Sequence, residues 1–449
     1  MYLCKVELKA VYKDIWKLGY PIMVGSLAQN LIGATDMIIL GWVGETEFAA
    51  SGLISTFYLI LVMIGFAISR GGQILISRRI GAGNYHQAGF WVRHLMYLEL
   101  GMALVLFLTI FFFSRQILAL FITNKDIYEA SLLYLDYRIF GLFFSCLSFV
   151  YMALYTSIGR TGIIAVITIA LFIINAGLNY LLVFGVGPFP EMGIAGSGLA
   201  STIAEVVCTG LAFIWICYDR YLKPLQLFNF EAVNFVSLKR LFNLSFPIIV
   251  QYIMGLGGWF LLFSIIESLG KRALSVSTVV KMVYTFYSIP AWGMASAANA
   301  LVSNIIGQQK HSRVFIAIYR TIIVSVVITI VLCLSLVLFP AYIAHIFTQD
   351  TAIAQAAIPL FYPLIFILLA SAVSAVIFNG LMGTGAVIYS LLIEMFSIIV
   401  YLGYAVALVK WVTEVQLWYV WMAEFIYWTL LAILAWAFLK RSNWEDFHI

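Results

Sequence analysis

Asp36 is the residue whose type and position point most directly to chemistry. It lies fifteen residues beyond Pro21, in a run of residues that is otherwise apolar. A charged group in hydrocarbon costs several kcal/mol unless it is paired or faces water, so such residues are functional by default. Asp36 is therefore predicted to exchange a proton or to coordinate Na+. The alternative is a structural aspartate that forms hydrogen bonds where two helices meet.

Two asparagines form a second candidate feature, because Asn175 and Asn179 are four residues apart and share one face of a helix. Hard cations require several oxygen ligands, and side-chain amides supply oxygens without adding charge. The spacing indicates a cation-binding face. The alternative interpretation is a pair of amide hydrogen bonds between helices.

Further ionisable residues also fall within apolar runs, and they are Arg70, Glu205, Lys281, Glu394 and Glu424. An unpaired charge at such a position is expensive, so Lys281 is predicted to pair with a glutamate of its own half, with Glu394 as the first choice. Together with Gln29 and Asn299, these residues are our candidates for a substrate-binding cavity. Purely structural ion pairing is the alternative.

The composition shows what kind of protein must position these groups. Hydrophobic residues make up 64% of the 449 residues, charged residues only 10%, and the mean hydropathy is +1.04. Soluble domains carry about 25% charged residues. The net charge of +5 is too scattered for a nucleic-acid surface, and the five cysteines show no CxxC spacing. The chain is therefore predicted to be an integral membrane protein whose partner is the lipid bilayer.

Apolar runs of about 20 residues, the length that crosses a bilayer, predict an all-α protein with twelve transmembrane helices. No alternation of polarity supports a β-barrel. The second and eighth runs are long enough to be tilted or broken, and Pro290 lies inside the eighth. The runs are 18–40, 48–76, 95–113, 134–156, 163–185, 194–217, 243–268, 274–305, 317–339, 356–380, 386–409 and 416–438.

The short loops set the orientation, because cytoplasmic loops carry an excess of Lys and Arg. With the N-terminus inside, the cytoplasmic side collects most of the loop lysines and arginines. The opposite side receives only Arg115, Lys125, Lys271, Arg272 and Lys410. Both termini are therefore predicted to be cytoplasmic.

The chain also repeats itself at an offset of 226 residues. The offset divides the twelve predicted helices into two halves of six. Because six is an even number, both halves begin on the same side of the membrane and must be parallel repeats. We predict an amino-terminal lobe (1–218), a cytoplasmic linker (219–240) and a carboxy-terminal lobe (241–449). The ungapped pairs include Pro21 with Pro247, Tyr58 with Tyr284, Ser77 with Ser303 and Gly81 with Gly307, and small shifts then pair Gly162 with Gly385 and Ala204-Glu205 with Ala423-Glu424.

Several segments resemble the MATE (multidrug and toxic compound extrusion) transporters. They are YPIMVGSLAQNLIGATDMIILGWVG in the first run, GGQILISRRIGAGN at the end of the second, INAGLNYLLVFG in the fifth and GIAGSGLAST in the sixth. The resemblance covers nearly the whole chain and is most specific in its amino-terminal half. It implies two lobes that form a V-shaped cavity, and export of organic, often cationic compounds driven by inward Na+ or H+.

The resemblance also assigns residues. It places the essential first-helix aspartate at Asp36 and implies a cation site of Asp36, Asn175 and Asn179 with Ser201 or Thr202, a metal site if the ion is Na+. Some members carry a second aspartate where this chain has Asn179, which argues against proton coupling through a carboxyl pair. The glutamate of the seventh helix, eight residues after the proline, is replaced by Gly255. A carboxy-lobe cation site is therefore not transferred.

Three classes of function remain to be compared. A secondary antiporter of amphiphilic or cationic solutes in the bacterial inner membrane is the first, acting as a monomer with no cofactor beyond the transported Na+ or H+. A flippase for a lipid-linked precursor is the second, and a strongly basic cavity would favour it. A membrane-embedded enzyme is the third, and the sequence lacks any catalytic or nucleotide-binding motif that would support it.

Overall fold

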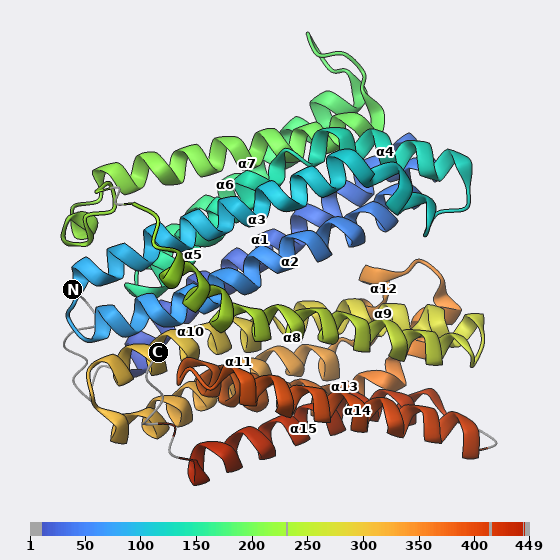
Figure 1. Ribbon diagram of the computed structural model, residues 1–449. Coiled ribbons are helices and arrows are strands. Elements are labelled where there is room, and N and C mark those ends of the chain that lie inside the picture. Colours follow the sequence, from blue (N-terminus) through green and yellow to red (C-terminus); the bar gives the residue numbers. More distant parts are fainter. Residues whose placement is uncertain (1–10, 230–231, 413–414, 443, 445–449) are drawn as a thin grey trace. The chain divides into compact units, whose positions relative to one another are not determined.

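A computed structural model describes residues 11–229, 232–412, 415–442 and 444, and the described chain is almost entirely helical (Figure 1). Two short 3-10 segments, η2 (Arg220–Leu225) and η3 (His311–Arg313), accompany the α-helices. The α-helices are α1 (Val11–Val43), α2 (Glu45–Gly81), α3 (Tyr85–Ala119), α4 (Lys125–Arg138), α5 (Gly141–Ser157), α6 (Gly162–Phe184), α7 (Gly193–Tyr218), α8 (Phe235–Glu267), α9 (Lys271–Tyr287), α10 (Ile289–Gly307), α11 (Val314–Leu338), α12 (Pro340–Phe347), α13 (Thr351–Gly383), α14 (Val387–Trp411) and α15 (Leu417–Arg441).

Each predicted span falls on one of these helices or on a consecutive pair, and the helices extend up to ten residues beyond the predicted bounds. Among the described residues, ten helices are long and apolar enough to cross a membrane, and α4 with α5 supplies an eleventh as a pair bent by 54°. The remaining predicted span, 274–305, is covered by α9 and α10. The chain is thus a multi-pass helical membrane protein.

Two of the predicted spans are interrupted. The eighth is broken at Ser288, as the position of Pro290 suggested, because proline lacks the N–H that would continue the helical ladder. The second, α2, is continuous over 37 residues, so its length does not reflect a break. The fourth is broken at Ile139 and Phe140, which the sequence analysis did not foresee.

Short polar residues fix several helix ends. The Asn84 side chain accepts a hydrogen bond from the Gln87 N–H at 3.1 Å and caps α3, and Asn124 caps α4 in the same way. Helix α6 ends at Gly185, whose φ of 65° is the left-handed conformation that favours glycine. These caps set where α3, α4 and α6 begin or end.

The described chain divides into two compact units. The amino unit comprises Val24–Ile80 and Asn84–Ile249, and the carboxy unit comprises residues 11–23, Gly81–Gly83 and the described chain from Val250 onward. Helices α1 and α8 therefore each contribute to both units. The division falls two residues after Pro21 in α1 and two residues after Pro247 in α8, so it obeys the 226-residue repeat. The lobe boundaries predicted at 218 and 241 followed the charged linker, whereas the compact units divide inside α8.

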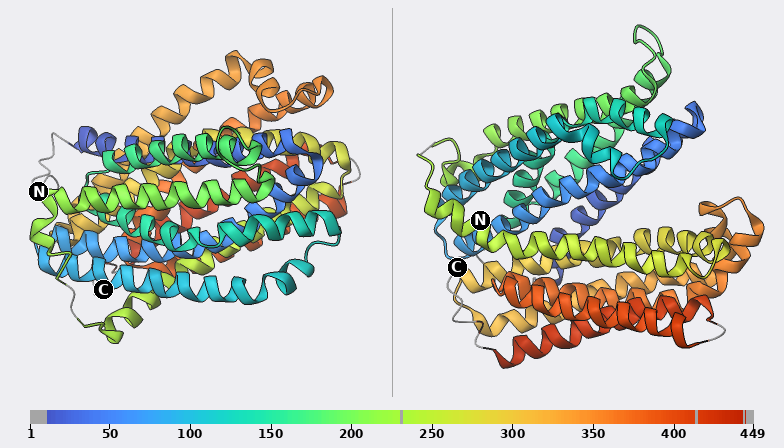
Figure 2. Two further views of the ribbon diagram at one scale, coloured as in Figure 1. Left: turned by 90° about the horizontal axis from the view of Figure 1, so that it is seen from above. Right: turned by 45° about the vertical axis from the view of Figure 1, so that its right-hand side comes forward.

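Each unit has its own apolar core. In the amino unit, Leu40 of α1 and Ile54 of α2 pack with Leu142 of α5, all fully buried. In the carboxy unit, Phe361 and Leu364 of α13 pack with Trp421 of α15. Figure 2 shows the orange and red helices of the carboxy unit, α13 to α15, running side by side. The core packing holds both the polar groups of α1, α6 and α7 and those of α14 and α15 at fixed positions.

Candidate functional site

The amino unit brings together the polar residues that the sequence singled out. Asp36 of α1 is only 8% exposed, and the Asn179 side-chain amide of α6 donates a hydrogen bond to its Oδ1. The Ser201 hydroxyl of α7 donates to Asp36 Oδ2 at 3.4 Å, and Asn175 Nδ2 donates to Ser201 Oγ at 2.9 Å. Three helices thus converge on one carboxylate.

The amide oxygens of Asn175 and Asn179 are the unexplained feature of this cluster. Both Oδ1 atoms are buried, and neither has a hydrogen-bond partner among the described residues. Buried acceptors are normally satisfied, so an unsatisfied pair calls for an explanation such as an ion. Two amide oxygens, a hydroxyl and a carboxylate are the ligand types that hard cations prefer. The donor set therefore fits a bound cation.

The sequence left Ser201 and Thr202 as alternative members of the cluster, and the structure distinguishes them. The Thr202 hydroxyl donates to the Tyr137 carbonyl at 2.9 Å, which ties α7 to α4. Ser201 is consequently the hydroxyl that reaches Asp36.

A buried ion pair, Arg138 with Glu205, was missed by the sequence analysis. The Arg138 guanidinium of α4 donates two hydrogen bonds to the Glu205 carboxylate of α7, at 2.6 and 2.8 Å, and lies 4.0 Å from the Tyr58 ring centroid. It is also close enough to Asp36 to interact with it electrostatically. A signal was present, because a buried glutamate requires a base and Arg138 lies inside the predicted span 134–156.

The break between α4 and α5 makes room for this pair. A Cβ atom on Gly141 would collide with the Arg138 guanidinium and would lie 2.5 Å from Glu205 Oε2. Any other residue would displace the ion pair, because the missing side chain of glycine is what allows the two groups to approach the backbone. The bent fourth span therefore positions the arginine.

Lys281 requires a correction. Its side chain on α9 is exposed, and among the described residues it forms no ion pair with Glu394 or with any other carboxylate. The ammonium instead lies 5.0 Å from the Phe263 ring centroid and 5.7 Å from that of Trp259. The predicted Lys281–Glu394 pair is therefore wrong, because aromatic faces supply the stabilisation that a carboxylate was expected to give.

The two carboxy-unit glutamates are deeply buried. Glu394 of α14 is 8% exposed and accepts a hydrogen bond from Tyr427 Oη at 3.3 Å. Glu424 of α15 is 1% exposed, and its Oε2 has no hydrogen-bond partner in the described part of the chain. These groups form a second acidic site, which lies wholly within the carboxy unit.

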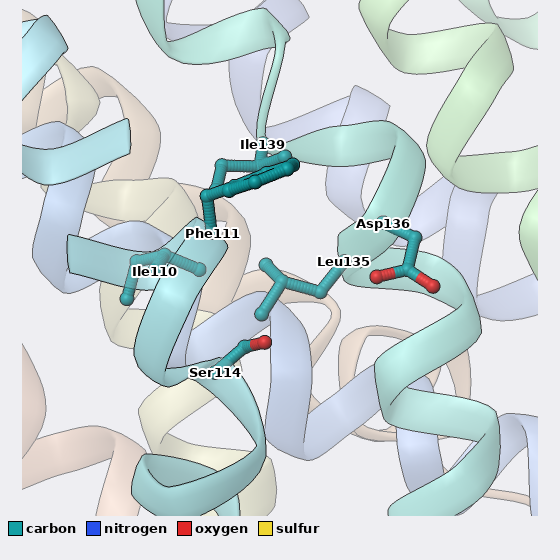
Figure 3. Close-up of a pocket in the computed structure, with 6 residues that line it drawn as sticks. All are labelled: Ile110, Phe111, Ser114, Leu135, Asp136 and Ile139. Carbon is teal, nitrogen blue, oxygen red and sulfur yellow. The ribbon is translucent and has the colours of Figure 1, made fainter. Parts of the chain in front are cut away.

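The other substrate-cavity candidates remain predictions, and the structure shows only the exposure or a single contact of each. Gln29 is exposed, Arg70 donates to Gln73 Oε1 at 3.2 Å, and Asn299 donates to the Asn379 carbonyl at 3.3 Å. A cavity of about 200 Å³ lies elsewhere in the amino unit (Figure 3). It is lined by Ile110, Phe111, Ser114, Leu135, Asp136 and Ile139, none of which was a candidate.

A further buried acid, Glu99 of α3, was also overlooked. It is fully buried, and neither carboxyl oxygen has a hydrogen-bond partner in the described chain. Its Oε2 and the Cys146 Sγ each lie 3.0 Å from where a Cβ on Gly65 would be. The sequence signal was a single glutamate in the apolar run 95–113.

Buried bases are also more numerous in the amino unit than expected. Arg70, Arg78, Arg93 and Arg138 are each 8% exposed or less. Arg138 is neutralised by Glu205, and Arg93 donates to the Gln226 carbonyl at 2.7 Å. Arg70, Arg93 and Arg138 therefore serve contacts within the unit.

A two-repeat helical membrane bundle with buried polar groups on its helices defines the class of secondary transporters. The MatE family model matches residues 21–181 and 247–407, so its two copies begin at Pro21 and Pro247. The chain belongs to the MATE family of membrane transporters and is not an enzyme.

Individual relatives agree with this assignment. The probable multidrug resistance protein NorM of Pasteurella multocida (strain Pm70) is 26% identical over 344 residues, covering 76% of this chain and 74% of its own. A MOP superfamily transporter from Pyrococcus furiosus Vc1 (DSM3638) superposes with a TM-score of 0.87 at 20% identity, covering 96% of this chain and 97% of the other. An outward-facing multidrug resistance MATE family transporter gives 0.88, at 20% identity and 96% and 95% coverage. The structural matches establish the fold.

Proposed function

We propose that this protein is a secondary antiporter that exports organic, cationic or amphiphilic compounds, driven by inward Na+ or H+ that is coupled at Asp36. The observation that carries the proposal is the buried Asp36 carboxylate together with the two unsatisfied amide oxygens of Asn175 and Asn179. Relatives named as multidrug resistance protein NorM and multidrug export protein MepA support the substrate class.

The cluster suits a coupling site for a physical reason. A cation at Asp36 satisfies the carboxylate and the two amide oxygens at once, whereas the empty site leaves all three in a poorly solvated interior. Ion occupancy therefore changes the energy of packing α1 against α6 and α7, which is what coupling requires. The free amide oxygens make Na+ the first ion to test, since a proton needs only Asp36.

The proposal also covers the membrane location, the oligomeric state and the cofactors of the protein. The distribution of loop Lys and Arg supports cytoplasmic termini, and the bacterial NorM relatives support the inner membrane as the location. The coupling site draws on one chain only, which supports a monomer as the working unit. The ion is transported, and no resident cofactor is part of the proposal.

The experiment is efflux of a fluorescent organic cation from proteoliposomes, under a Na+ gradient alone and then under a pH gradient alone. We expect efflux under at least one gradient and its loss in Asp36→Asn. Asp136→Asn is the matched control, because Asp136 is an exposed aspartate of the same unit. Efflux under neither gradient, combined with movement of a lipid-linked sugar between leaflets, would show a flippase instead.

A further inference from the structure

The carboxy unit contains an acidic site that the family comparison does not assign. Glu394 and Glu424 lie on α14 and α15, whereas the resemblance pointed to α8, where this chain has Gly255. Tyr427 donates to Glu394 and also interacts electrostatically with Glu424. Tyr284 of α9 and Tyr401 of α14 are close enough to Glu424 to interact with it as well. Three helices, α9, α14 and α15, thus surround the two carboxyl groups.

In the part of the chain that the structure describes, no base forms an ion pair with either carboxyl group. Helix α13 corresponds to α4 and α5 in the repeat and packs against α15, yet its sequence contains no charged residue, so nothing replaces Arg138. Helix α8 faces Glu394 with Gly255, whose Cβ position lies 3.7 Å from Oε1. Lys281 lies over Phe263 and Trp259 and, within the described chain, pairs with no acid. A buried carboxylate without a partner is strongly disfavoured.

The surrounding groups decide which cation fits. Apart from the two carboxyls, the site offers tyrosine hydroxyls and the Trp428 indole, whose N–H donates to Tyr284 Oη at 3.0 Å. A metal ion requires several oxygens that are free to coordinate it. Here the Tyr427 hydroxyl donates to Glu394, and the Tyr284 oxygen already accepts from Trp428. A proton requires a single carboxyl oxygen, and Glu424 Oε2 is buried and unpartnered in the described chain.

We propose that Glu424, linked to Glu394 through Tyr427, forms a proton-binding site in the carboxy unit, separate from the cation site at Asp36. Binding converts the Glu424 carboxylate and one proton into a neutral carboxyl group. The site holds its proton at neutral pH, because the neutral form tolerates burial among aromatic rings. The inference is independent of which ion drives export, since proton occupancy is an equilibrium property of the folded protein.

The test is infrared difference spectroscopy of the full-length purified protein carrying 13C-labelled glutamate, between neutral and alkaline buffer. The label separates glutamate carboxyl bands from those of Asp36. We expect a protonated-glutamate band at neutral pH that disappears in Glu424→Gln and shifts in Glu394→Gln. Glu267→Gln, an exposed glutamate at the end of α8, should leave the band unchanged. Saturating Na+ should not remove it.

Equal bands in wild type, Glu424→Gln and Glu394→Gln would overturn the proposal, as would loss of the band on adding Na+. Glu99 is also buried and unpartnered in the described chain, so it could give a similar band. Every sample is therefore prepared a second time in a protein that also carries Glu99→Gln. Size-exclusion profiles check folding of each variant. If Glu424→Gln does not fold, the Glu99→Gln protein decides the matter, because absence of a labelled carboxyl band in it would refute the site.

Discussion

Glu205 and Glu424 occupy corresponding positions in the two repeats, within Ala204-Glu205 and Ala423-Glu424, yet their environments differ. In the amino unit, Arg138 binds Glu205 with two hydrogen bonds. In the carboxy unit, the corresponding helix α13 has no charged residue, and Oε2 of Glu424 has no partner in the described chain. The comparison teaches that a repeat preserves where an acid lies without preserving what neutralises it, so one copy is structural and the other is free to bind a proton.

The largest expected effect concerns Asp36, an acid that has no counterpart in the second repeat. The residue 226 positions after Asp36 is the buried, apolar Leu262, so the cation site belongs to the amino unit alone. Asp36→Asn should reduce coupled efflux to the level of empty vesicles while leaving the protein folded, since removing a buried charge relieves desolvation. Efflux and thermal stability are measured together. Normal transport by this variant would eliminate Asp36 as the coupling residue.

The second prediction tests the comparison itself through stability. Glu205→Gln leaves the Arg138 guanidinium buried and unpaired, so we expect it to lower the free energy of unfolding by about 3–5 kcal/mol. Glu424→Gln strands no base and should leave stability unchanged or raised. Thermal unfolding in detergent measures both. Equal destabilisation by the two substitutions would mean that the environments are equivalent after all.

The third prediction concerns the unsatisfied amide oxygens. Asn175→Ala or Asn179→Ala should weaken the apparent affinity for the driving ion about tenfold, corresponding to about 1.4 kcal/mol, with a smaller change for the exported compound. Asn379→Ala is a control, because its side chain bonds only its own helix, at the Ala375 carbonyl. Ion dependence of efflux is the measurement. A change in drug affinity alone would place these residues in the drug pathway and the ion site elsewhere.

The smallest expected effect is at Lys281. Its loss in Lys281→Met removes contacts with two aromatic faces, each worth about 0.5–1 kcal/mol at exposed sites. We expect slightly lower thermal stability and no rescue by adding Glu394→Gln, because the two side chains do not pair. Expression levels are compared for the single and double variants. Clear rescue of transport by the second substitution would restore the ion pair predicted from the sequence.

The amino-acid sequence by itself determined the class of protein, the positions of the helices and the repeat, and it singled out Asp36 as the candidate coupling residue. These features follow from hydropathy, from the 226-residue offset and from the cost of a carboxylate in an apolar run, all of which are local properties of the chain. Asn175 and Asn179 were found in the same way, because helical periodicity places them on one face.

Only the tertiary structure decided which charges meet. Arg138 reaches Glu205 because the fourth span bends by 54° and Gly141 leaves room for both side chains. Lys281 misses Glu394 because its ammonium lies on Phe263 and Trp259. Pairing across helices depends on their rotation and on breaks within them, and neither is encoded by hydropathy. The same reason separates Ser201, which reaches Asp36, from Thr202, which binds the Tyr137 carbonyl.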